Sequence, residues 1–68
     1  MQLDLRQAII QRMQGKTTEE LAQVIEDSVG HDERMLPGLG VLFEIIWQNS
    51  QQNARDQMVN TLSNHLSS

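Results

Sequence analysis

The sequence predicts an all-α protein, a small bundle of three to four short helices around a hydrophobic central third helix. Three observations predict it: apolar residues recur at helical spacing, start and stop signals frame these segments, and no strand-like alternation is bounded by turn residues. The chain has 68 residues, no internal repeat and no proline-rich linker. We therefore expect residues 1–68 to form a single helical domain.

The first helix is expected over residues 3–14. Asp4 is expected to cap the N-terminus of this helix or to stabilise its first turn. Gly15 is expected to end the helix by adopting a left-handed backbone conformation. The apolar stripe of this helix consists of Leu5, Ala8, Ile9 and Met13, with Leu3 and Ile10 on its flanks.

The second helix is predicted to begin at a capping box. In this motif the Thr17 hydroxyl accepts a hydrogen bond from the backbone near Glu20, and the Glu20 carboxylate accepts one in return. Gly30 is expected to end the helix, and residues 31–34 to form a polar connector that could include a helical turn. The stripe on its inner face consists of Leu21, Val24, Ile25, Ser28 and Val29.

The third helix, within residues 36–47, is apolar on almost every side and carries one charge, Glu44. We expect it to be buried all round, enclosed by the other three helices or by a second copy of the chain. Pro37 fits its first turn. Gly38 and Gly40 each cost roughly 1 kcal/mol in a helix interior, which indicates either a frayed first turn or the close approach of a neighbouring helix. The core or interface candidates are Leu39, Leu42, Phe43, Ile46 and Trp47.

A polar turn at residues 49–53 precedes a fourth amphipathic helix, which is expected to fray near Ser67. We expect His65 to be partly buried beside the apolar stripe of this helix. The predicted face consists of Ala54, Met58, Thr61, Leu62, His65 and Leu66.

Composition disfavours several classes of function. The net charge is −4, and the five basic residues are scattered, so general coating of nucleic acid is disfavoured. There is no cysteine and only two histidines, far apart in sequence, so no metal or cofactor is expected. The first residues lack the apolar run of a secretory signal, and the third helix is too short for a membrane span. We expect the product to stay inside the cell.

The sequence contains no credible array of nucleophile, base and orienting group, so we expect no catalytic residues and no enzyme. Glu44 is expected to be exposed or paired with an arginine across the bundle rather than to act as a perturbed carboxylate. His31 is expected in a solvated loop. Trp47 is expected to anchor a core or an interface rather than to stack on bases.

Two segments resemble the small acid-soluble spore protein I family of endospore-forming Firmicutes. They are residues 4–10, Asp-Leu-Arg-Gln-Ala-Ile-Ile, and residues 35–47, Met-Leu-Pro-Gly-Leu-Gly-Val-Leu-Phe-Glu-Ile-Ile-Trp. The resemblance implies a minor, non-enzymatic protein that is made in the cytoplasm of the forespore during sporulation and is found in the spore core. The family is distinct from the α/β-type spore proteins that coat DNA. Departures lie mostly on the surface, at Gln7, Gln11, Gln51, Gln52 and the Ser67-Ser68 end.

Three hypotheses of function follow. The first is a structural or accessory protein of the spore core, with an unidentified protein as its partner. The second is a helical module for protein interaction or homodimerisation that uses the apolar surface of residues 39–47. The third and least favoured is DNA association, because we expect no strong nucleic-acid binding; no membrane partner is expected either.

Overall fold

The computed structural model describes residues 4–67, and these fold into four α-helices and one short 3₁₀ helix without a strand. The helices are α1 (Leu5–Met13), α2 (Thr18–Ser28), the 3₁₀ helix η1 (Glu33–Met35), α3 (Leu36–Gln48) and α4 (Gln52–Leu66). The all-α prediction is therefore confirmed. The predicted start of the first helix at Leu3 lies outside the described residues.

Local signals define the ends of α1. The Asp4 carboxylate accepts a hydrogen bond of 3.0 Å from the backbone N–H of Arg6, as a helix cap does. After the last turn, Gly15 adopts a φ of +82°, a conformation that costs little for glycine alone. Both predicted boundary residues thus act as expected.

The predicted capping box at the start of α2 is confirmed. The Thr17 hydroxyl accepts a hydrogen bond of 3.1 Å from the Glu20 N–H, and the Glu20 carboxylate accepts one of 2.8 Å from the Thr17 N–H. These bonds hold the pKa of Glu20 below its usual value, and the bond from the Thr17 backbone N–H has the largest effect. Gly30, with a φ of +73°, follows the helix as predicted.

The inner face of α2 is shorter than predicted. Leu21, Val24 and Ile25 are half-buried, and Ser28 is buried with its hydroxyl donating a hydrogen bond of 2.8 Å to the Val24 carbonyl oxygen. Val29, expected on the same stripe, is exposed. Val29 is the C-cap residue, and its extended ψ of 127° turns the following chain away from the helix axis, so no further turn of α2 lies beside its side chain.

The connector contains the expected helical turn, η1, which runs directly into α3. The Asp32 carboxylate accepts hydrogen bonds from the backbone N–H and the guanidinium of Arg34. These contacts lower the pKa of Asp32, and the bond from the Arg34 side chain has the largest effect. Pro37 lies in the first turn of α3, as predicted.

Neither predicted reason for the glycines of α3 is found. The helix is continuous from Leu36, so its first turn is not frayed. A Cβ atom built on Gly38 or on Gly40 would have no atom of a neighbouring element within 4 Å, so no helix of the described chain approaches them closely. Within one chain, both glycines are unexplained by packing.

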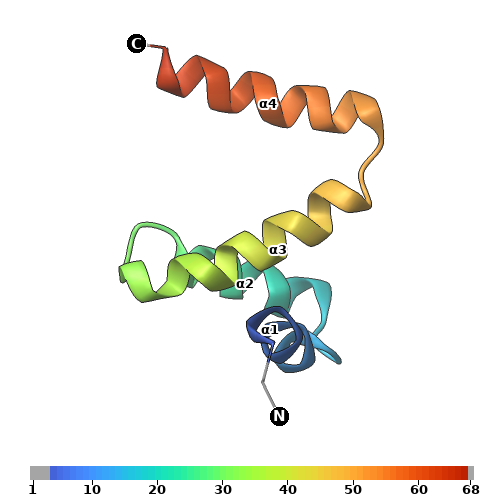
Figure 1. The fold of residues 1–68 in the computed structure, drawn as a ribbon, viewed down its shortest axis with the longest axis vertical. Coiled ribbons are helices and arrows are strands. Elements are labelled where there is room, and N and C mark those ends of the chain that lie inside the picture. Colours follow the sequence, from blue (N-terminus) through green and yellow to red (C-terminus); the bar gives the residue numbers. More distant parts are fainter. Residues whose placement is uncertain (1–3, 68) are drawn as a thin grey trace.

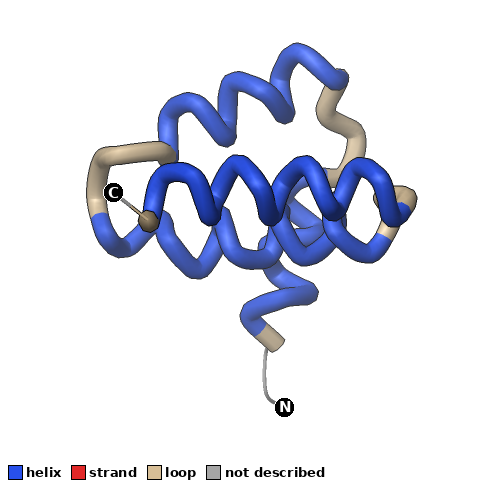
Figure 2. The backbone as a smooth tube through the Cα atoms, turned by 90° about the horizontal axis from the view of Figure 1, so that it is seen from above, coloured by secondary structure: helices blue, strands red, loops and turns tan. Residues whose placement is uncertain are grey.

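The helix α3 is the hub of the fold. Its backbone lies close to α1, α2 and η1, and Figure 1 shows α4 on the opposite side of α3 from α1 and α2. From the turn at residues 49–51, α4 runs back over α3 and diverges from it. Figure 2 gives the same arrangement from above. The result is a three-helix body with an outlying fourth helix.

Within one chain the third helix is not buried all round, so the alternative in which the other three helices enclose it is wrong. Val41, with 9% of its surface exposed, is the single buried apolar residue among residues 4–67. The radius of gyration is 13.6 Å, whereas a compact domain of this length has about 11 Å. The short helices α1 and α2 cover one side of α3, and the divergence of α4 leaves much of the other side open.

The helix α4 begins inside the segment predicted as a turn, with Gln51 at the cap position but no side-chain capping bond. It ends just before Ser67, as expected. Ala54 and Met58 are half-buried, but the rest of the predicted face is exposed, including His65. The prediction that His65 is partly buried is wrong, because α4 has diverged from α3 by the position of this residue.

No helix within residues 4–67 combines the length and the apolar character that crossing a bilayer requires.

We predict that removing the capping box destabilises the fold through α2. Thr17→Ala deletes the acceptor for the Glu20 N–H and should lower the free energy of unfolding by about 1 kcal/mol. Urea unfolding followed by circular dichroism, at one fixed protein concentration, measures this. Thr18→Ala is the matched control, because Thr18 lies one residue inside the helix and its side chain makes no capping bond. Equal losses in the two variants would contradict the prediction.

The capping box also makes the stability of the fold depend on pH, through the carboxylate of Glu20. Because the pKa of Glu20 is lower in the folded chain, its stabilisation is fully present above the unfolded pKa and is lost as the pH falls through the folded pKa. Glu20→Gln should therefore reduce the loss of stability on acidification below the usual glutamate pKa. An unchanged acid profile would show that the charge of Glu20 is not part of the capping box.

Candidate interaction surface

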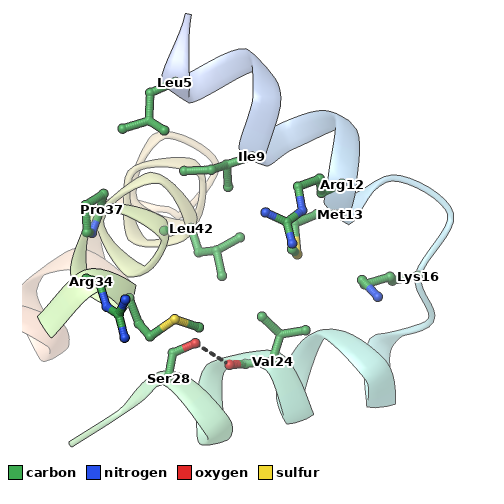
Figure 3. A pocket seen from close by; sticks show the side chains of 12 residues that line it. Leu5, Ile9, Arg12, Met13, Lys16, Val24, Ser28, Arg34, Pro37 and Leu42 are labelled. Carbon is green, nitrogen blue, oxygen red and sulfur yellow. Dashed lines mark hydrogen bonds between the residues drawn. The ribbon is translucent and has the colours of Figure 1, made fainter. Parts of the chain in front are cut away.

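One side of α3 faces a pocket of about 460 Å³ between α1, α2 and η1 (Figure 3). Its apolar lining includes Ile9, Met13 and Leu42. Three basic side chains also line it: Arg12 of α1, Lys16 of the loop that follows, and Arg34 of η1. The Ser28 hydroxyl is turned back onto the Val24 carbonyl and is thus already satisfied. The pocket is an incompletely filled space between three helices rather than a set of converging reactive groups.

An ion pair joins α1 to α3. The Arg6 guanidinium donates two hydrogen bonds to the Glu44 carboxylate, of 2.6 Å from Nε and 3.1 Å from Nη2. The bonds to this carboxylate raise the pKa of Arg6. The expectation that Glu44 pairs with an arginine across the bundle is confirmed. The ion pair therefore ties α1 to α3.

The opposite side of α3 forms a groove with α4, which we call the α3–α4 groove. It has a volume of about 500 Å³. It is lined by Gly40, Phe43, Glu44, Trp47, Met58, Val59 and Leu62. The rings of Phe43 and Trp47 lie 5.8 Å apart at an interplanar angle of 42°, so α3 presents a continuous aromatic surface to this groove.

Arg55 ties the start of α4 to the end of α3. Its Nε donates a hydrogen bond of 2.8 Å to the Trp47 carbonyl oxygen, and its guanidinium carbon lies 5.4 Å from the centroid of the Trp47 ring. Carbonyl groups in the last turn of a helix lack intrahelical partners, and an arginine commonly binds them. Sequence reasoning missed this contact. The available signal was an arginine shortly after a helix that contains no basic residue in its last turn.

The five core or interface candidates predicted on the third helix do not gather at one site. Phe43 and Trp47 line the α3–α4 groove, whereas Leu42 and Ile46 line another apolar pocket beside α1 and α2. Leu39, Leu42 and Trp47 are half-buried, and Phe43 and Ile46 are exposed. Sequence reasoning also missed Val59, which lies in the groove but outside the predicted face of the fourth helix.

The histidine and carboxylate side chains of the described residues do not gather into a metal-binding group. Across residues 4–67, no group of three or more histidine, cysteine or carboxylate side chains is placed to hold a metal ion. His31 is exposed in the connector, as expected, and His65 is exposed on α4. What the chain does offer is exposed apolar surface on α3 and α4.

The family model and the similar proteins name the same family. The family model for small, acid-soluble spore protein I matches residues 3–66. Proteins named small, acid-soluble spore protein I from Bacillus cereus strain AH187 and Bacillus anthracis strain A0248 are each 42% identical to this chain over 67 residues. The matches cover 97% of this chain and 97% of each relative. No solved structure matches the chain.

We predict that Arg55 sets the position of α4. Arg55→Met removes the hydrogen bond to the Trp47 carbonyl and the cation over the indole ring, and should lower the free energy of unfolding by about 1 kcal/mol. The emission of Trp47 should also change, because the guanidinium no longer lies over its ring. Arg12→Met is the matched control on α1. If the two variants had the same tryptophan emission and stability, the contact would have no structural role.

Proposed function

Because this chain belongs to the small, acid-soluble spore protein I family, we propose that it is a non-enzymatic protein of the bacterial spore core, made in the forespore. Membership makes it a spore-associated protein. The observation that carries the proposal is the match of the family model over residues 3–66, nearly the whole chain. Nearly every residue of the chain therefore takes part in the likeness on which this proposal rests.

The side chains support a structural or accessory role rather than catalysis. The carboxylates of Glu20, Asp32 and Glu44 are used in a helix cap, a turn and an ion pair. In enzymes such groups are arranged so that one orients or activates another beside a substrate site. The described residues instead use their charges to hold the helices in place.

We predict that the protein accumulates in spores and lies inside the coat. An antibody against the chain should detect it in disrupted, coat-stripped spores and in forespores, but not in vegetative cells. Deleting its gene should leave vegetative growth unchanged. Recovery from the coat fraction, or a growth defect in the deletion strain whose spores are normal, would contradict the proposal.

We also propose that the chain does not bind nucleic acid strongly. Arg6 and Arg34 are engaged in ion pairs, and Arg55 binds the end of α3. Arg12 and Lys16 line one pocket on the other side of α3. Proteins that bind the DNA backbone place several cations on one surface, where each phosphate contact adds to the affinity. Arg34 lines the same pocket but is paired with Asp32, and these three cations in a protein with a net charge of −4 do not provide such a surface.

The matching prediction concerns duplex DNA at low salt, the condition that most favours electrostatic binding. The purified chain should leave the mobility of a duplex unchanged, while a basic helical peptide of similar length retards it. Retardation by the chain that weakens as salt is added would show instead that it associates with DNA.

A further inference from the structure

The α3–α4 groove has apolar walls that remain in contact with solvent. Phe43 is 50% exposed, Val59 is 47% exposed and Leu62 is 58% exposed, although all three line the same concave surface. Further along α4, Leu66 is 73% exposed. A groove bordered by two helices and lined in this way has the form that accepts the apolar side of another helix.

The accessible surface area of the chain indicates how much surface a second copy could cover. The chain exposes 6022 Å², whereas a compact monomer of 7.8 kDa exposes about 4,400 Å². The excess is about 1,600 Å² for each chain, and it is spread over both sides of α3, because Leu5, Val29 and Leu36 are exposed as well. Half of this excess, covered in each of two chains, gives about 1,600 Å², the size of a typical stable interface. A second copy therefore has the right size to complete this fold.

The distribution of charge selects the side on which two copies can meet. Seven of the nine carboxylates lie in residues 4–33, on or beside α1, α2 and η1. Residues 57–64 of α4 contain no charged side chain. Two chains that each carry a net charge of −4 repel each other least when the α4 helices face each other.

Gly40 lies in the wall of the α3–α4 groove, at a position where a helix is weakened by glycine. A Cβ atom at this position would meet nothing within the chain. The close approach of a helix from a second chain supplies the neighbour that the isolated chain lacks. The glycine then gives room to that helix.

We propose that the chain forms a symmetric homodimer in which the α3–α4 groove of each copy receives the apolar side of the partner's α4. The contact is isologous, because each copy contributes one groove and one helix. It goes beyond the proposed function, since it concerns the assembly of the purified chain rather than its place in the spore.

Other occupants fit the groove less well. A membrane surface is recognised by an amphipathic helix with lysine and arginine on its polar face, and α4 contains a single basic residue of this kind, Arg55, which is bound to α3. A strongly charged protein partner would need complementary charges around the groove. The uncharged stretch of α4 favours a helix of its own kind.

The test is the molar mass of the full chain, measured by light scattering and by sedimentation equilibrium over a wide range of concentration. We expect a dimer that dissociates on dilution, with a red shift of the Trp47 emission as the groove becomes exposed. A monomer at all concentrations would overturn the proposal. So would a monomer that binds phosphatidylcholine vesicles or elutes with another protein when added to a spore extract, because the groove would then have a different occupant.

Two exposed leucines provide matched variants. Leu62→Glu places a carboxylate in the groove and should raise the dissociation constant of the dimer by about 100-fold or more. Leu5→Glu is the control, because Leu5 is 59% exposed, almost the same as Leu62, but lies on α1. It should leave the dimer unchanged. The reverse result, with Leu5→Glu as the disruptive variant, would place the dimer contact elsewhere and overturn the proposal.

A milder variant keeps the test valid if the Leu62→Glu chain loses its helices. Leu62→Ser removes apolar contact without adding a charge and should raise the dissociation constant by about tenfold. Helicity measured by circular dichroism, at a concentration where the wild type is dimeric, shows that the variant is folded. An undiminished affinity in the folded Leu62→Ser chain would also overturn the proposal.

Discussion

The structure depends on a mismatch between the apolar surface of α3 and the surface that three short helices can cover. Nearly every position of α3 is apolar, yet α1 and α2 reach only one side of it, and Val41 alone among its apolar residues is buried. Local bonds at Asp4 and Thr17 fix where α1 and α2 begin, but they cover no apolar surface. The open groove and the outlying α4 both follow from this shortage of cover.

Features that depend on neighbouring residues were predicted well. The capping box at Thr17 and the glycine after each of the first two helices are decided within one turn of backbone, and a single sequence contains all the information needed. The pairing of Glu44 with an arginine was also predicted, because a lone carboxylate in an apolar helix needs a partner or solvent. Its partner, Arg6, lies 38 residues away and was not named.

Features that depend on the direction of a whole helix were predicted poorly. The apolar stripe of α4 suggested a packed face, with His65 beside it, but amphipathic spacing indicates which residues share a face and not what covers that face. The groove was missed for the same reason. Its walls come from two helices that are joined by the turn at residues 49–51 and by the contacts of Arg55 with Trp47. Family membership assigns the chain to the spore, but it does not reveal this geometry.

The crowding of carboxylates into the first half of the chain has a consequence for solubility. A molecule with one acidic end and one neutral, apolar end resembles a surfactant, and such molecules grow into large aggregates unless their charged ends keep them apart. When the neutral ends are enclosed in a pair, two acidic ends remain outside, and their mutual repulsion opposes the addition of a third chain. In the proposed dimer, the separation of charge that brings two copies together would therefore also limit the assembly to two chains.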